Sequence, residues 1–344
     1  MLTTLLSFAF VLGLLIFVHE FGHFITAKMV GIRVERFSLG FPPRMIGKKI
    51  GDTDYCISWL PLGGYVKMAG MIDENLDANI KGEPYEFASK PVWQRSIVLS
   101  AGSVMNILTA IVIFTALTLA NGVPRPEGAL ISEVIQGKPA DVIGLKAGDV
   151  ITSIDDQPIK TSEELTSIIH KHPGQQVTIT WLRDGQEFHS PVVPEPQPET
   201  HIGLIGIRVG TKMHYEKAGL AESLSFGVSN SFTILKLTVQ SLKLIITGQE
   251  SFRDAVGGPI IIAKLAGESA RLGFQSLLTF TAIISLNLGF FNLLPFPVLD
   301  GGHLVLLLLE GIRRKPIPVK TRLVIQKVGM AFLLALMVFI LIND

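Results

Sequence analysis

Two histidines and a glutamate lie close together near the start of the chain, in the run His19-Glu20-Phe-Gly-His23. On a helix, residues four apart share a face, so both imidazoles can reach one metal ion. Glu20 would stand beside that metal, where a carboxylate can accept and donate a proton. The spacing therefore predicts a metal site that carries its own general base.

The surroundings of this run strengthen the prediction. It lies in an apolar stretch, 4–27, that is long enough to cross a hydrocarbon core about 30 Å thick. An ionisable group inside a bilayer costs at least ~2.5 kcal/mol unless it has a partner, so a group of them indicates a metal or a polar cavity. Lys28 follows His23 by roughly 7.5 Å of helix, which places the site towards the basic end of the span.

A third ligand is expected, because catalytic zinc usually takes three protein ligands and leaves one position open. The best candidate is Asp300, which follows a stretch that Pro295 and Pro297 prevent from staying helical. Irregular backbone at membrane depth is tolerated only where it is buried in protein or lines a cavity. The residues alone leave two alternatives open: His303 could be the third ligand, and Asp300 could instead cap the helix 301–311.

The composition is that of a membrane protein. Hydrophobic residues make up 48% of the 344 residues and charged residues only 17%, against about 25% charged in an average soluble domain. The formal net charge of +1 gives no sign of nucleic-acid binding. Cys56 is the only cysteine, which excludes an intrachain disulfide and a cysteine-based zinc site. Apolar stretches predict four spans, at 4–27, 96–120, 277–309 (broken at the prolines) and 323–342.

Lysines and arginines cluster after the first span and between the last two, which predicts that both of these loops are cytoplasmic. They are Lys28, Arg33, Arg36, Arg44, Lys48 and Lys49, then Arg313, Arg314, Lys315, Lys320, Arg322 and Lys327. Both termini and the segment 121–273 are then extracytoplasmic. The first span has no basic residue before it, so we expect it to remain rather than to be removed as a signal peptide. The histidines of the segment are expected to be surface residues: His170, His172, His189, His201 and His214.

Residues 124–197 have the pattern of a small soluble domain, with short β-rich runs between prolines and glycines and a helical pattern at 161–172. The run Gly144-Leu-Lys-Ala-Gly-Asp149 resembles PDZ domains of bacterial proteases. Such domains bind an extended peptide between a strand and a helix. The expected groove residues are Leu130, Ile131, Leu165, Ile168 and Ile169.

Three further segments have recognisable patterns. Residues 51–70 predict a β-hairpin at the membrane surface that turns at Gly63–Gly64, with an ordinary cytoplasmic loop as the alternative. The proline-rich 191–200 predicts a stiff linker leading out of the small domain. Residues 222–246 predict an interfacial amphipathic helix rather than a fifth span, because they carry too many polar side chains.

Several of these runs together resemble the site-2 protease family of intramembrane zinc metalloproteases, and within it the bacterial sigma-E regulator type. They are HExxH in the first span, Asn292-Leu-Leu-Pro-Phe-Pro-Val-Leu-Asp-Gly-Gly in a broken later span, the PDZ-like domain between them, Arg33-Val-Glu-Arg-Phe-Ser-Leu-Gly-Phe, Pro61-Leu-Gly-Gly-Tyr-Val-Lys-Met and Ser285-Leu-Asn-Leu-Gly289. The resemblance covers nearly the whole chain.

The resemblance implies that His19, His23 and Asp300 hold one zinc ion per chain and that Glu20 is the catalytic base. It implies that substrate meets Asn292, Pro295, Pro297, Gly63, Gly64 and Asn106. The implied substrates are single-span membrane proteins such as an anti-sigma factor, with remnant signal peptides as a further class and an upstream site-1 protease as a partner. The implied location is the bacterial inner membrane, with the PDZ domain and both termini on the periplasmic side.

Two features depart from the family pattern. Ala101-Gly-Ser103 lacks the proline that commonly follows the glycine, and there is room for one PDZ domain where the sigma-E regulator type often has two. Two rival functions remain: a non-catalytic PDZ membrane adaptor with a structural metal, and a membrane-anchored zincin that cuts soluble loops. A structural zinc normally has four protein ligands, which disfavours the adaptor.

The sequence therefore predicts a polytopic α-helical membrane protein with four transmembrane helices, a membrane-associated β-hairpin and an inserted α+β PDZ domain. The predicted parts are the first transmembrane helix (1–30), a cytoplasmic-side loop with the hairpin (31–95), the second helix (96–121), the PDZ domain (124–197), a linker with amphipathic helices (198–273), the broken third helix (274–311) and the fourth helix (321–342).

Overall fold

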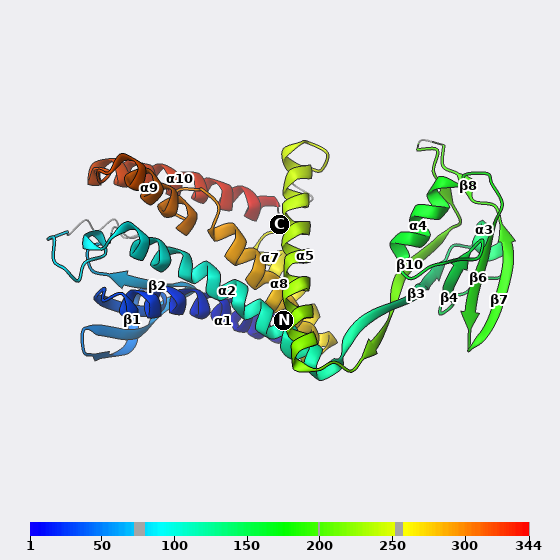
Figure 1. The fold of residues 1–344 in the computed structure, drawn as a ribbon, viewed down its shortest axis with the longest axis horizontal. Coiled ribbons are helices and arrows are strands. Elements are labelled where there is room, and N and C mark those ends of the chain that lie inside the picture. The colour runs from blue at the N-terminus through cyan, green and yellow to red at the C-terminus, as the bar shows by residue number, and fades with distance from the viewer. Residues whose placement is uncertain (72–79, 199, 252–256, 344) are drawn as a thin grey trace. The chain divides into compact units, whose positions relative to one another are not determined.

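The computed structural model describes residues 1–71, 80–198, 200–251 and 257–343 (Figure 1). The chain divides into a helical unit, made of Met1–Leu117 and Leu220–Asp344, and a β-rich unit, Thr118–Gly219, inserted between its two parts. The predicted candidate site belongs to the helical unit, and the predicted PDZ domain belongs to the β-rich unit.

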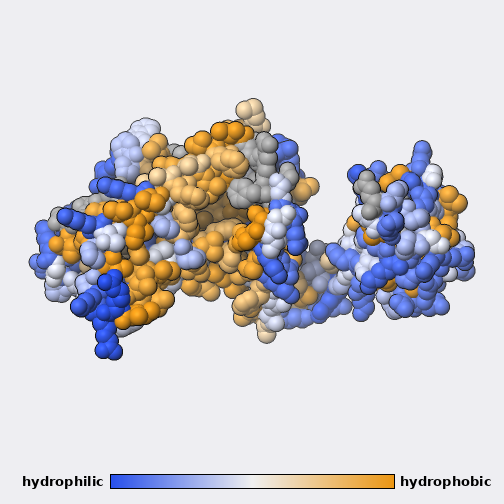
Figure 2. Space-filling model, turned by 90° about the horizontal axis from the view of Figure 1, so that it is seen from above, coloured by the Kyte–Doolittle hydropathy of each residue, from blue (hydrophilic) through white to orange (hydrophobic). Residues whose placement is uncertain are grey.

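Four helices of the described chain are long and apolar enough to cross a membrane, which matches the predicted number. They are α1 (Leu2–Met29), α2 (Val92–Asn121), α8 (Phe274–Asn292) and α10 (Val319–Asn343, apolar over Val319–Ile342). Hydrophobic residues cover much of the visible face of the helical unit in Figure 2, whereas hydrophilic residues predominate on the visible face of the β-rich unit.

The break predicted in the third span is present. Helix α8 ends at Asn292, shortly before the prolines, and α9 (Asp300–Arg313) begins immediately after them. A residue that precedes proline is disfavoured in the helical region, so the chain cannot pass through 293–299 as a helix. The consequence is that α9 starts in the interior of the unit with Asp300 as its first residue.

Helix α5 (Leu220–Ile246) packs through a row of small residues. Ser223, Gly227 and Ser231 recur every four positions and are buried. The Cβ position of Gly227 lies 3.0 Å from the Ile111 carbonyl oxygen of α2, so only a small residue fits there. As the sequence predicted, α5 is not among the four strongly apolar helices of the described chain; its interfacial location stays a prediction. Two further helices in the described part of the unit are η1 (Phe87–Ser89) and α7 (Pro259–Leu272).

Strands β1 (Val34–Ile50) and β2 (Thr53–Met68) form a sheet beside α1. The first half of β1 lies between two stretches of β2, since Phe37 is paired with both Tyr55 and Val66. Aromatic side chains join this sheet to α1; the rings of Phe24 and Phe37 lie 5.1 Å apart. The stretch of β2 that ends at Met68 therefore runs along α1, which carries the HExxH run.

The chain reverses direction close to the predicted turn. Residues 36–39 of β1 pair with 54–57 in rising register and with 64–67 in falling register, so β2 bends back between Ile57 and Gly64. A further turn lies at Gly51–Asp52. Gly64 also has to be small, because a Cβ there would lie only 2.9 Å from a methyl carbon of Ile16 and 3.1 Å from Cγ of Glu20. A glycine pair signals a turn or a close approach, and here it allows β2 to pass close to α1.

The β-rich unit contains a sheet in the order β10-β3-β4-β6-β7, with β5 paired to β4. Its strands are β3 (Val123–Val134), β4 (Val150–Ile154), β5 (Gln157–Pro158), β6 (Val177–Arg183), β7 (Gln186–Val192) and β10 (Ile207–Glu216). A small pair, β8 (Glu195–Pro196) and β9 (Gly203–Leu204), and two helices, α3 (Pro139–Val142) and α4 (Ser162–Lys171), complete the unit.

Helix α4 begins with a capping box, in which the Thr161 side chain accepts from the Glu164 backbone and Glu164 reaches back. The buried Asp149 accepts two bonds of 2.7 Å from Arg183, and this carboxylate raises the pKa of the arginine above its usual value. The capping box thus stabilises the start of α4, and the ion pair joins the start of β4 to the end of β6.

Two predictions for this unit are corrected. The proline-rich 191–200 does not lead out of the domain, because its residues contribute to β7 and β8 and the chain then returns as β10, paired with β3 along its length. The predicted end of the domain at 197 is therefore too early. The pairing was hidden in the sequence, since the partner strands are separated by some 80 residues.

Only two of the five predicted groove residues, Leu165 and Ile169, line a hollow on the surface of this unit. Ile131, Leu165 and Ile169 belong to the buried core, and Ile168 packs against it. Leu130 is paired on both sides, with Gly210 of β10 and Val150 of β4. The hollow beside α4 is instead bordered by the chain that leads into β10; it is lined by Ile135, Leu165, Thr166, Ile169, His170, Leu204, Ile205, Gly206, Ile207 and Val209.

Candidate metal centre

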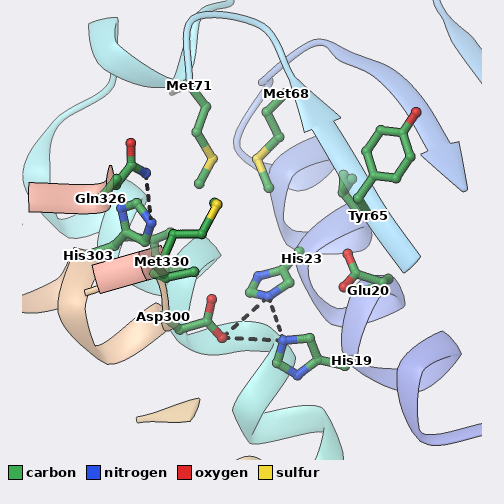
Figure 3. A pocket seen from close by; sticks show the side chains of 13 residues that line it. His19, Glu20, His23, Tyr65, Met68, Met71, Asp300, His303, Gln326 and Met330 are labelled. Atoms are coloured by element: carbon green, nitrogen blue, oxygen red, sulfur yellow. Dashed lines mark hydrogen bonds and ion pairs between the residues drawn. The ribbon is translucent and has the colours of Figure 1, made fainter. Parts of the chain in front are cut away.

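His19, His23 and Asp300 come together in the helical unit, although 277 positions of sequence separate His23 from Asp300 (Figure 3). The histidines lie one turn apart on α1, and Asp300 comes from the start of α9. Within the described part of the chain, these are the residues that form a group of possible metal ligands. Asp300 does not act as a helix cap, since the cap position is Leu299 and Asp300 points to the histidines.

The three donor atoms are spaced as a zinc ion requires. The Nε2 atoms of His19 and His23 are 3.2 Å apart. Oδ2 of Asp300 lies 3.4 Å from Nε2 of His19 and 3.5 Å from Nε2 of His23. Tetrahedral zinc with bonds of about 2.0–2.1 Å sets its ligand atoms about 3.3–3.4 Å apart. The triangle therefore fits three vertices of a tetrahedron, and the fourth would be open.

The tautomer of His23 fits a metal as well. Its Nδ1 lies 2.8 Å from the carbonyl oxygen of Val98, which can only accept a hydrogen bond. The ring proton of neutral His23 is therefore on Nδ1, and the lone pair of Nε2 is directed at the other two ligand atoms.

Gly102 of α2 leaves room for the two imidazoles. A Cβ on this residue would lie 2.8 Å from Cε1 of His19 and would collide with Nε2 of His23. Real Cβ atoms do not approach other atoms so closely, so a larger residue would displace both ligand side chains. The glycine at position 102 of an apolar helix is thus explained by this close approach.

Glu20 lies on one side of a cavity of about 90 Å³ that contains the three ligands. Figure 3 shows His303 and Gln326 on the opposite side, with Met68 and Met71 above the ligands. Three residues of β2, Tyr65, Val66 and Met68, line the cavity too. A carboxylate, a cluster of metal-binding atoms and a strand thus meet in one hollow.

The predicted substrate residues lie around this cavity rather than in its wall. The described lining residues do not include Asn292, Pro295, Pro297, Gly63 or Gly64. The break after α8 contributes Val298 to the lining, and the segment that follows the two glycines contributes Tyr65. Their contact with substrate remains a prediction.

The placement of Asn106 differs from the prediction that it meets substrate. It is 0% exposed, and its Nδ2 lies 3.3 Å from Nδ1 of His19. Asn106 therefore contacts the back of a candidate ligand rather than the open side of the cavity.

His303 is outside the ligand cluster but inside the cavity wall. Its Nε2 is 3.4 Å from Nε2 of Gln326 in α10. This favours Asp300 over His303 as the third ligand. Gln326 and Met330 of the same helix line the cavity and were missed, because an apolar span offers no spacing signal for single residues that face a distant site.

Comparison with known proteins agrees with this geometry. The family model of peptidase family M50 matches residues 7–336. A Clostridium perfringens protein, named as a candidate zinc metalloprotease, is 35% identical over 330 residues, which are 96% of this chain and 95% of that protein. The regulator of sigma-W protease RasP of Bacillus subtilis is 30% identical over 416 aligned positions, covering 99% of this chain and 98% of its own.

The zinc metalloprotease RasP of Oceanobacillus iheyensis is 31% identical and covers 100% of this chain and 99% of its own. Among solved structures, the PDZ domain of an SdrC-like protein from Listeria innocua is 29% identical and covers 26% of this chain and 99% of its own, with a TM-score of 0.23. The match of the family model over nearly the whole length, together with these relatives, shows that the chain belongs to peptidase family M50, the site-2 proteases, and is a zinc metalloprotease.

Proposed function

We propose that this protease hydrolyses a peptide bond within or near the transmembrane segment of single-span membrane proteins. The observation that supports this is the position of the ligand cluster: two of its residues lie within α1 and the third at the start of α9, in a unit built from strongly apolar helices. Its substrates would be anti-sigma factors in a stress response, as the name of the Bacillus subtilis relative suggests, with remnant signal peptides as a second class.

His19, His23 and Asp300 would hold one zinc ion, which supplies activation of water and polarisation of the scissile carbonyl. Glu20 takes the proton of the attacking water and then delivers it to the leaving nitrogen. It lies in the wall of the same cavity as the ligand atoms, so one carboxylate can serve both steps.

A transmembrane substrate must be unwound before attack, because the carbonyls of a helix are already hydrogen-bonded. Strand β2 offers a template for the unwound segment: its stretch around Val66 pairs with β1 on one side, and Tyr65, Val66 and Met68 line the cavity. An extended peptide could add to the sheet there by main-chain hydrogen bonds. The prolines and Asn292 of the break would hold it from the other side.

The proposal also covers the location of the enzyme and the roles of the hairpin and of the β-rich unit. The enzyme would lie in the bacterial inner membrane, with the PDZ-like unit and both termini on the periplasmic side. The predicted β-hairpin of residues 51–70 would associate with the membrane. The hollow beside α4 would bind an exposed tail of the substrate, left by an upstream site-1 protease.

The test is co-expression of the full chain, or its Glu20→Gln variant, with a panel of single-span proteins, followed by mass spectrometry of the products. Removal of a general base typically costs 10²–10⁴-fold in rate, so we expect cleavage by the wild type to disappear. Glu268→Gln, an exposed position on α7, is the matched control and should cleave normally.

The location of the cut distinguishes the alternatives. Products that end within or next to the hydrophobic segment support the proposal. Products that end only in soluble loops would instead indicate a membrane-anchored zincin, and undiminished cleavage by Glu20→Gln would remove Glu20 from the mechanism.

A further inference from the structure

One face of α2 contacts all three candidate ligands. The carbonyl oxygen of Val98 lies 2.8 Å from Nδ1 of His23. The hydroxyl of Ser103 donates to Oδ2 of Asp300 at 3.3 Å. Nδ2 of Asn106 lies 3.3 Å from Nδ1 of His19. These three residues of α2 are five and three positions apart, so they spread over about 140° of the helix circumference.

The contact between Asn106 and His19 has an unusual feature. Asn106 is 0% exposed, and its Oδ1 has no hydrogen-bond partner, while its Nδ2 faces the ring nitrogen. The two ends of an amide are interchangeable by a half-turn about the last side-chain bond. After that half-turn, Oδ1 would accept from Nδ1–H of His19.

The half-turn gives Oδ1 a donor and moves Nδ2 to the place where Oδ1 lacked one, so the number of hydrogen bonds alone does not decide between the two orientations. The tautomer of His19 does decide between them. A histidine that binds metal through Nε2 must carry its proton on Nδ1, and it usually donates that proton to a neighbouring acceptor.

The supporting face of α2 is itself held by α8. The hydroxyl of Ser285 donates to the Asn106 carbonyl oxygen at 2.7 Å, and Ser285 is 0% exposed. One turn later, a Cβ on Gly289 would lie 2.8 Å from the carbonyl oxygen of Ser103, so the two helices are in close contact. The contacts with α8 therefore hold α2 in place and, with it, the side chains of Ser103 and Asn106.

We propose that Ser103 and Asn106 are positioning residues of the metal centre: Asn106 accepts a hydrogen bond from His19 and fixes its tautomer, and Ser103 orients the carboxylate of Asp300. This inference rests on the proposed assignment of the three ligands. It assigns to Asn106 a role behind the metal, in place of the substrate contact that the family resemblance implies.

The test measures zinc affinity of the purified full-length protein by competition with a chromophoric chelator, and the visible spectrum of the cobalt-substituted protein. The variants are Asn106→Leu, Asn106→Asp and Ser103→Ala. Ser100→Ala is the matched control, because its hydroxyl donates only to carbonyls of its own helix, those of Ser96 and Ile97.

Loss of such an outer partner typically lowers metal affinity 10–100-fold. We expect Asn106→Leu to lower zinc affinity about 10-fold and to shift the cobalt spectrum, with a smaller loss for Ser103→Ala. Asn106→Asp, which can still accept from Nδ1–H, should restore affinity to within about 3-fold of the wild type, which also shows that the site folds without the amide.

Two outcomes would overturn the inference: Asn106→Leu and Ser103→Ala that bind zinc and cobalt like Ser100→Ala, or Asn106→Asp that is as weak as Asn106→Leu. Either one leaves the proposed function intact, because the wild type still binds zinc. Failure of the wild type to bind zinc would overturn the ligand assignment itself.

Discussion

Helix α9 carries two carboxylates that differ in what surrounds them, the buried Glu310 and the half-buried Asp300. Glu310 is paired with Arg95 at 3.0 Å and with Arg322, and it accepts from the backbone of Ile317 at 2.7 Å. Asp300 faces two imidazoles and a hydroxyl, and no lysine or arginine pairs with it in the described parts of the chain.

The difference teaches how to distinguish a structural carboxylate from a metal ligand. A buried carboxylate is stable only if positive charge or several donors compensate it. Glu310 obtains both from the protein and joins α2, α9 and α10. Asp300 lies beside rings that can be neutral, and one of them has its lone pair directed at the same point, so a cation completes the group.

The largest expected effect is the loss of zinc from Asp300→Ala. Zinc binding in structural sites with four protein ligands amounts to about 10–16 kcal/mol, so removal of one of three ligands here should cost at least ~3 kcal/mol, or more than 100-fold in affinity, and abolish proteolysis. Metal analysis after dialysis against a chelator measures it. Stoichiometric zinc in the variant would contradict the comparison.

Glu310→Ala should do the opposite, lowering stability while leaving zinc affinity unchanged. Removing one partner of a buried ion network leaves Arg95 and Arg322 uncompensated, which costs about 3–5 kcal/mol. Unfolding by SDS in mixed micelles measures the loss, and the chelator competition is run on the folded fraction. If Glu310→Ala were as stable as the wild type, Arg95 and Arg322 would have to be compensated by other groups in the variant.

A third carboxylate, that of the buried Asp149 in the β-rich unit, extends the comparison. It is 1% exposed and is bound by Arg183 and by the backbone of Lys146. Asp149→Ala should lower the melting temperature of this unit by the equivalent of about 1–3 kcal/mol, because the backbone donor loses its partner. Zinc content and activity on a substrate with a short tail should not change, and a parallel loss of zinc would refute this independence.

The smallest effect is expected for His303→Ala. His303 lines the cavity but lies outside the ligand cluster, so zinc affinity should change by less than about 3-fold. The same metal analysis decides, with Asp300→Ala beside it. If His303→Ala loses zinc and Asp300→Ala keeps it, the two residues exchange roles.

The parts of the site that depend on local spacing could be predicted from the sequence. His19 and His23 share a helix face whatever the rest of the chain does, and the prolines before Asp300 break any helix. The partners of these residues could not be predicted, because Ser103 and Asn106 show no special spacing in an apolar helix. Their role depends on which side of α2 meets α1.

The errors in the fold have a similar origin. The close approach of Gly64 to α1 was missed, because a glycine pair indicates a turn as readily as a close approach. The last strand of the β-rich unit was missed because its partner is far away in sequence, and the prolines before it looked like a linker. Non-local pairing of this kind is decided by tertiary context.

The pairing of β3 with β10 has a practical consequence. Val123 and Glu216, the first residue of one strand and the last of the other, are paired directly, so the chain enters and leaves the β-rich unit at neighbouring points. Domains with adjacent ends can be exchanged as whole cassettes, because a different domain with the same end-to-end spacing places no strain on its host. Residues 123–216 are thus a natural site for grafting a fluorescent reporter or an affinity handle without rebuilding the helices that hold the metal.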